Sequence, residues 1–177
     1  MTDDLEDSLI ARTQSYLKAK QTDKAKFSAQ ELSRMDPKDA IVWFVKAKVH
    51  YMMEEYDDAL SSLAKAAQIN SEQPEIWLLM GYTLIALRRY LEAKESLEYV
   101  HAMQPEDAEV SSALCVLFTI LGDEQTARQY FEHSKELDKS ATYKVLAHFY
   151  EEVFRPSAQL SPQMKENLEA MLSKIRI

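Results

Sequence analysis

Apolar side chains recur along this chain at helical intervals, in short segments separated by brief polar breaks. One set at i, i+3, i+4 and i+7 consists of Trp77, Met80, Gly81 and Leu84. After the polar pair Arg88-Arg89, a second set consists of Ala93, Leu97 and Val100. This spacing places side chains on one face of a helix. The pattern therefore predicts two helices joined by a short turn.

The predicted helix pair repeats with a period of 34 residues. Alanine returns at this interval at Ala25, Ala59, Ala93 and Ala127, and tryptophan returns at Trp43 and Trp77. After an expected N-terminal tail, residues 1–5, the period gives four blocks: 6–39, 40–73, 74–107 and 108–141. Because one helix pair cannot cover its own apolar face, successive pairs are expected to stack on one another.

The ends of the predicted helices carry capping residues. Asp39 and Asp107 stand where a side chain accepts a hydrogen bond from the first turn of a helix. Ser140 is expected to do the same, one residue earlier in its block. Pro74 marks a block junction, because proline is tolerated at a helix start but not inside a helix.

The amino-acid composition agrees with an all-α chain and makes some classes of partner unexpected. The sequence has only 2 glycines and 5 prolines, whereas a β-rich fold needs more turn glycines. The net charge is −8, so nucleic acid and anionic membrane surfaces are not expected partners. Cys115 is the single cysteine, which fits a reducing compartment, and no secretory signal or membrane span is evident. We expect a cytoplasmic protein.

The third block carries a family pattern. It contains Trp77-x2-Met80-Gly81-x2-Leu84, then Tyr90-x2-Ala93-x3-Leu97, then Pro105. This order closely resembles the tetratricopeptide repeat. The resemblance covers residues 6–141 and implies an all-α fold, a right-handed α-solenoid of helix-turn-helix repeats. The two tryptophan positions are expected in its core.

Both ends of the chain depart from the repeat pattern. Lys46 and His50 fill slots of the second block that should be apolar, which suggests looser packing in the N-terminal half. Residues 142–177 are expected to form an extra helix and a C-terminal capping helix. The extra helix is apolar nearly all round, so it should be buried on more than one side. Ser161-Pro162 is expected to start the last helix.

The resemblance also implies a binding surface, because the first helix of each pair lines a concave groove in this family. By that resemblance, ten residues are predicted to contact a partner: Phe44, Lys48, Tyr51, Met52, Leu78, Tyr82, Ile85, Val116, Thr119 and Ile120. Most are apolar, and a monomer seldom leaves a continuous apolar strip exposed. We therefore expect a protein-interaction scaffold that binds a peptide or amphipathic helix of another protein, as an adaptor, assembly factor or chaperone-like protein.

Two alternatives remain open for this strip. The chain can cover it by itself, through tight curvature of the stack or through its last helix. A second copy of the chain can also cover it, which would make the protein a self-associating structural protein, such as a homodimer.

Catalysis finds no support in the sequence. No Gly-rich phosphate loop, CxxC pair or HExxH motif is present, so we expect no enzyme, no catalytic residues and no cofactor. His148 with Glu151 and Glu152 has a spacing that could begin a metal site on one helix face. A structural role for this single histidine is favoured, and no metal site is predicted.

Overall fold

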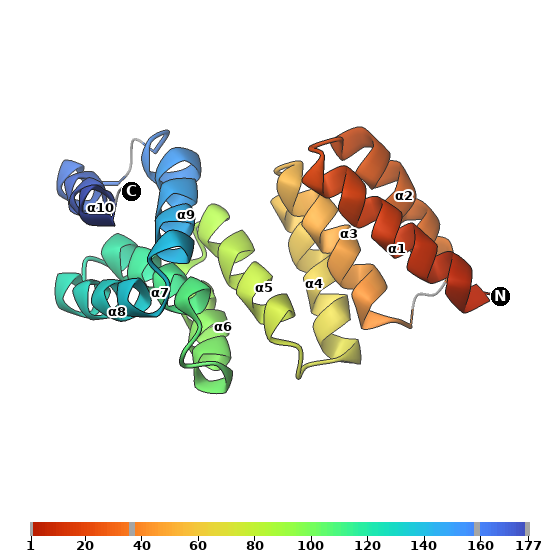
Figure 1. Cartoon of the computed structure of the whole chain (residues 1–177), viewed down its shortest axis with the longest axis horizontal. Coiled ribbons are helices and arrows are strands. Elements are labelled where there is room, and N and C mark those ends of the chain that lie inside the picture. The colour runs from red at the N-terminus through yellow and green to blue at the C-terminus, as the bar shows by residue number, and fades with distance from the viewer. Residues whose placement is uncertain (1, 36–37, 158–159, 176–177) are drawn as a thin grey trace. The chain divides into compact units, whose positions relative to one another are not determined.

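A computed structural model describes residues 2–35, 38–157 and 160–175, and every regular element in these ranges is a helix (Figure 1). The all-α prediction is therefore confirmed. The chain divides into two compact units, Met1–Leu87 and Arg88–Ile177. Within the described ranges, no helix has both the length and the apolar composition that a bilayer crossing requires.

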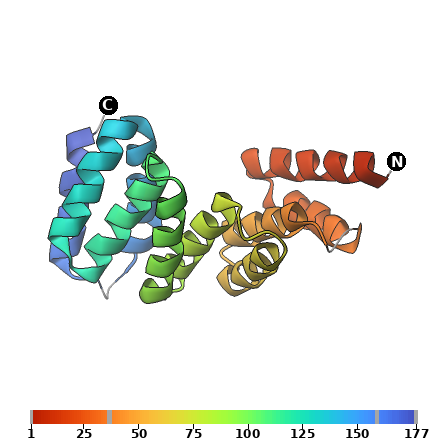
Figure 2. The ribbon, with the colours of Figure 1, turned by 90° about the horizontal axis from the view of Figure 1, so that it is seen from below.

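The first unit contains five helices. They are α1 (Thr2–Lys18), α2 (Thr22–Met35), α3 (Ala40–Met52), α4 (Tyr56–Ile69) and α5 (Pro74–Ala86). Each helix packs against the next one, and α1 also contacts α3 (Figure 2). Residues 2–5, expected as a tail, instead form the first turn of α1.

The core of the first unit is layered between successive helices. Among the described residues, three clusters of buried side chains are Leu9, Leu32, Val42 and Val45; Leu17, Ala25, Ala29 and Val49; and Ala47, Leu63, Ala66 and Ile76. Each of these clusters joins residues of three successive helices. This layering is what a stack of helix pairs requires, because each pair buries its apolar face on a neighbour.

The second unit is built around one central helix. Its elements are α6 (Tyr90–Met103), α7 (Ala108–Leu121), α8 (Glu124–Leu137), α9 (Lys139–Phe149), the π-helical η1 (Tyr150–Phe154) and α10 (Pro162–Ile175). The helices α6, α8, α9 and α10 all pack against α7. Every residue of α7 from Val110 to Ile120 is consequently buried.

The turn inside each helix pair has one left-handed residue at the same repeat position. Lys20, Glu54, Arg88 and Gly122 have φ of 54°, 59°, 61° and 79°, and they lie 34 residues apart. At the turn of Gly122, its N–H donates to the Thr119 carbonyl at 3.2 Å and the next N–H donates to the Phe118 carbonyl at 3.0 Å. Such paired bonds end a helix and favour glycine at the left-handed position. The turns therefore preserve the 34-residue period in the backbone itself.

The predicted helix starts are confirmed in most cases. The carboxylates of Asp39 and Asp107 accept hydrogen bonds from first-turn N–H groups, and Pro74 is the first residue of α5. The assignment of Ser140 as a cap is wrong. Asp138 caps α9 instead, with Oδ1 accepting from the N–H groups of Ser140 at 2.8 Å and its successor at 3.0 Å. The Asp138 carboxylate accepts from both of these first-turn N–H groups, so the helix starts two residues earlier than expected.

The two tryptophans are half-buried, which differs from the expected core placement. The Nε1–H of Trp77 donates to the Ser71 carbonyl at 2.8 Å, so this indole keeps a polar edge. The ring of Trp43 has the ammonium groups of Lys46 and Lys65 at 5.0 Å and 4.1 Å from its centroid. Burial, followed by repulsion from Lys65, lowers the pKa of Lys46.

Candidate partner-binding face

Four of the ten predicted contact residues lie together on one side of α3. Phe44, Lys48, Tyr51 and Met52 follow helical spacing, and Ile41 extends the same side by one turn. We call these five residues the α3 face. Ile41 and Met52 are 41% and 40% exposed, Lys48 is exposed, and the two aromatic residues are half-buried. The α3 face is therefore an accessible surface that is mostly apolar.

Ring contacts fix part of the α3 face. The Lys48 Nζ lies 5.1 Å from the centroid of the Phe44 ring, within the range of a cation–π contact. The Tyr51 ring meets the Tyr56 ring edge to face, with 5.6 Å between their centroids. Because Tyr56 is the first residue of α4, this contact anchors the end of α3 to the next helix. The face thus has ordered aromatic side chains and one positive charge.

The remaining predicted contact residues are less accessible. On α5, Leu78 is half-buried, Tyr82 is 9% exposed and Ile85 is fully buried. On α7, Val116, Thr119 and Ile120 are all buried. Partner contact by these residues stays a prediction, and the structure brings only the four α3 residues together on an accessible face.

The last helix covers part of the fourth repeat. α10 packs against α7, α9 and η1, and Asn167 donates to the Glu124 carboxylate at 2.9 Å. The Cys115 thiol lies beneath this helix, 3.6 Å from the Met171 sulfur. Burial raises the pKa of Cys115 to about 12, so the thiol stays protonated and unreactive. Ser161 accepts from the Met164 N–H, which confirms the predicted start of α10.

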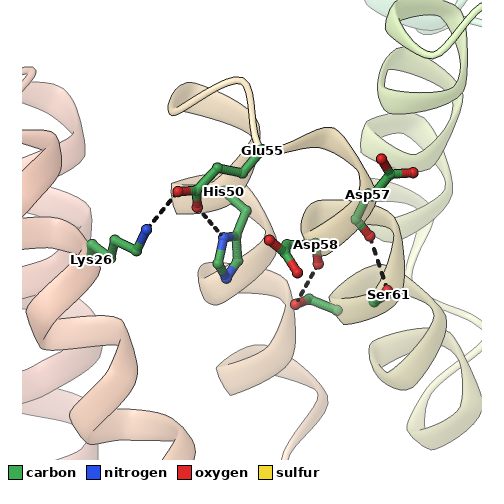
Figure 3. Close-up of polar contacts among 7 residues, drawn as sticks. Lys26, His50, Glu55, Asp57, Asp58 and Ser61 are labelled. Carbon is green, nitrogen blue, oxygen red and sulfur yellow. Dashed lines mark hydrogen bonds and ion pairs between the residues drawn. The ribbon is translucent and has the colours of Figure 1, made fainter.

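A polar cluster at the turn between α3 and α4 was not predicted (Figure 3). The Glu55 carboxylate binds the Lys26 Nζ at 2.5 Å through one oxygen and the His50 Nδ1 at 2.6 Å through the other. Asp58 lies beside them. The repeat pattern predicted His50 as a polar residue in an apolar slot and assigned no role to Glu55. The signal that it missed is that a turn of this length returns residue 55 to residue 50.

His148 lies outside the group of converging ligand atoms in the described part of the chain. There, the one group of His, Cys, Asp or Glu side chains with three converging ligand atoms consists of His50, Glu55 and Asp58. Burial lowers the pKa of His148, with Glu152 acting in the opposite direction. Its ring stacks edge to face with Phe149 at 5.3 Å between centroids.

Sequence comparison places the chain near two groups of proteins. The family described as "Anaphase-promoting complex, cyclosome, subunit 3" matches residues 18–100. Anaphase-promoting complex subunit 3 of Schizosaccharomyces pombe is 24% identical over 128 residues, which are 72% of this chain and 19% of that protein. Cilia- and flagella-associated protein 70 of Homo sapiens is 23% identical over 107 residues, which are 60% of this chain and 10% of that protein. The chain therefore matches only a small part of each relative.

Solved structures share the fold over nearly the whole chain. PilF of Pseudomonas aeruginosa aligns with 98% of this chain and 77% of its own, with 21% identity and a TM-score of 0.73. A chain of the APC/C hetero-tetramer Cut9-Hcn1 aligns with 98% of this chain and 34% of its own, with 23% identity and a TM-score of 0.73. YrrB, described as a TPR protein with an unusual peptide-binding site, aligns with 93% of this chain and 85% of its own, with 15% identity and a TM-score of 0.64. Together with the repeated helix pairs and their turns, these similarities show that the chain has the helical-repeat fold of tetratricopeptide-repeat proteins.

Proposed function

We propose that this protein is an interaction scaffold whose α3 face binds an amphipathic helix of a partner protein. The observation that carries the proposal is the exposure of Ile41 and Met52 at the two ends of this face, with ordered aromatic residues between them. Large apolar side chains that pack against their own protein and remain accessible to a partner are typical anchors of protein interfaces. The proposal includes an adaptor or chaperone-like role in a reducing, cytoplasmic setting.

Charge indicates the chemistry of the partner helix. The helix α3 contains no Asp or Glu, whereas Lys48 stands at the centre of its exposed side. A partner helix with a carboxylate beside its apolar stripe would pair with this ammonium group. A partner helix with a lysine at the same position would place two positive charges together, so the α3 face should discriminate against it.

The comparisons support binding of a peptide or protein without identifying it. YrrB is described as having a peptide-binding site, and Cut9 is part of a hetero-tetramer with Hcn1. Both are less than 25% identical to this chain, so they support the fold, and the binding role is carried over here as a proposal. Four partly exposed side chains give a modest apolar gain, so we expect an affinity no tighter than about micromolar.

The test uses two synthetic amphipathic helical peptides with a leucine stripe, one flanked by glutamate and one by lysine. We expect the full chain to prefer the glutamate peptide in fluorescence anisotropy. Met52→Glu should weaken this binding at least about tenfold, because a carboxylate would enter an apolar contact. Lys48→Glu should reverse the preference between the two peptides. Tyr82, which is buried, is unsuited to this test because its replacement would disturb folding.

Met103→Glu is the matched control, because Met103 is 38% exposed and lies in the other unit. This variant should bind both peptides as the wild type does. Equal binding by wild type and Met52→Glu would remove the α3 face as the site. If light scattering showed a dimer that Met52→Glu dissociates, the self-association alternative would replace the proposal.

A further inference from the structure

The side chains of His50, Glu55 and Asp58 meet at the turn between α3 and α4 (Figure 3). We propose that these three residues bind one divalent transition-metal ion of the zinc class. The site lies apart from the exposed apolar side of α3, and the inference does not depend on the proposed function. It concerns a ligand that neither the repeat pattern nor the compared proteins indicate.

The donor atoms converge as a metal site requires. One ligand atom from each of the three side chains lies within 4.8 Å of the other two. An ion about 2.0–2.2 Å from each imidazole nitrogen and carboxylate oxygen fits between atoms at such separations after small side-chain shifts. One nitrogen and two carboxylate oxygens suit Zn²⁺, Co²⁺ or Ni²⁺, whereas Mg²⁺ and Ca²⁺ prefer oxygen ligands alone.

The ligands are held by a defined backbone. His50 lies in the last turn of α3, and Asp58 lies in the first turn of α4. Between them, Glu54 has the left-handed φ of 59°, and the Glu55 N–H donates to the His50 carbonyl at 2.9 Å. The Glu55 carbonyl in turn accepts from the Ala59 N–H at 2.9 Å. The site is therefore built on two helix ends and a hydrogen-bonded turn, which limits the motion of its ligands.

Lys26 orients the central carboxylate. Its Nζ bonds Glu55 Oε1, which leaves Oε2 directed at His50. Ligating carboxylates commonly have their second oxygen bonded in this way, which fixes a single oxygen on the metal. An ion would enter between Oε2 and the imidazole ring.

The charges and exposure at the turn suit a cation. The Glu55 carboxylate pairs with the ammonium group of Lys26, the Asp58 carboxylate adds a second negative charge, and Lys46 attracts Asp58 electrostatically. The His50 side chain is 13% exposed, while Asp58 is exposed. The ion can therefore reach the site from solvent, and water can complete its coordination. Because Lys26 belongs to α2, bound metal would also reinforce the junction between the first two helix pairs.

The experiment titrates the full chain with ZnCl₂ by calorimetry and with CoCl₂ by visible absorption. We expect one equivalent to bind and MgCl₂ not to compete. His50→Ala and Asp58→Asn should each weaken metal binding by about 10–100-fold or more. Loss of a residue that only supports a metal ligand already has an effect of this size. His148→Ala is the matched control, because it removes a histidine outside the site, and its binding should equal that of the wild type.

A structural readout accompanies the titration. Both tryptophans lie in the first unit, so Zn²⁺ should raise the fluorescence melting temperature of wild type and His148→Ala but not of Asp58→Asn. His50→Gln and Glu55→Gln serve if His50→Ala fails to fold, as judged by circular dichroism. Absence of saturable binding would overturn the proposal. Weak binding of several ions that all variants share would identify adventitious surface binding and overturn it as well.

Discussion

The helices α3 and α7 occupy the same place in the repeat, yet α3 keeps one accessible side and α7 is buried almost all round. Lys48 is exposed, whereas Val116, 68 residues later, is fully buried. Met52 is 40% exposed, whereas its counterpart Ile120 is 6% exposed. The difference follows from what packs on α7 within its own unit, namely α6, α8, α9 and α10. The repeat register therefore sets the helix pair, while neighbouring elements decide which side of it remains a surface.

The two units also differ in their aromatic residues. Phe131, Phe149 and Phe154 in the second unit are fully buried or nearly so. In the first unit, Trp43 and Trp77 are half-buried and keep contacts with polar or charged groups. Apolar burial stabilises in proportion to the area removed from water, so truncation should cost more in the second unit. Because both tryptophans belong to the first unit, their fluorescence reports that unit alone.

The largest predicted effect sharpens this contrast. Phe131→Ala should lower the free energy of unfolding by about 3–5 kcal/mol, because it leaves a cavity in a fully packed site. Trp77→Ala, at the family's large-residue position, should cost less, because the indole is only partly buried. Urea unfolding followed by circular dichroism measures both variants. A larger loss for Trp77→Ala than for Phe131→Ala would contradict the burial comparison.

The next prediction tests what the two units share. Ala93 in α6 and Ala59 in α4 are fully buried at the same repeat position. Replacement of either residue by leucine should overpack a helix contact and cost about 1–3 kcal/mol. Leu91→Ala is the control, since Leu91 is 73% exposed and should change stability by less than about 0.5 kcal/mol. Thermal melts should show similar losses for the two alanine sites, and a tolerated leucine at either would contradict the shared register.

The sequence was sufficient for the helix pairs but not for their environments. The alanines at 34-residue spacing predicted a repeated close contact, and all four are buried to 1% exposure or less. The tryptophan positions were expected in the core from the same pattern, yet both indoles are only half-buried. Trp43 contacts two ammonium groups, and Trp77 donates a hydrogen bond to a backbone carbonyl. Periodicity reports which residues share a helix face, and it does not report what lies opposite that face.

The binding residues show the same limit. The pattern placed the predicted residues on first helices, but burial of Tyr82 and Ile120 depends on packing that no short-range spacing encodes. The side chains of Lys26, His50 and Glu55 bring together α2, α3 and the turn that follows α3. Along the chain these residues are isolated polar positions, because their proximity exists only after the helices stack.

The left-handed turns give a smaller and matched comparison. Gly122→Ala should cost about 1–2 kcal/mol, because a Cβ disfavours a φ of 79°. The new Cβ would meet only the Met164 methyl at 3.9 Å, so the cost is backbone strain rather than a clash. Lys20→Gly, at the equivalent turn of the first unit, should instead stabilise by up to about 1 kcal/mol. Urea midpoints of the two variants should shift in opposite directions, and a parallel shift would show that the turns are not equivalent.

The smallest predicted effect concerns Glu55 and Asp123, which also share one repeat position. Hydrogen bonds to Lys26 and then His50 lower the pKa of Glu55, whereas the side chain of Thr126 lowers the pKa of Asp123. Each carboxylate then stabilises the fold above its ordinary pKa, and this contribution is lost as the pH falls through the lowered value. Glu55 is part-exposed, so its contribution should stay below about 1 kcal/mol.

The two carboxylates should nevertheless respond differently to salt. Glu55 acts on a charge from another helix, so the difference between wild type and Glu55→Gln should shrink both from pH 7 towards pH 3 and with added NaCl. Asp123 accepts hydrogen bonds from Thr126 within its own turn, at 3.1 Å from the N–H and 2.7 Å from the hydroxyl. The stability difference between wild type and Asp123→Asn should therefore also shrink as the pH falls, but added NaCl should change it less. Urea midpoints over a grid of pH and NaCl measure both, and a Glu55→Gln difference that stays constant across the grid would show that Lys26 and His50 contribute nothing through this carboxylate.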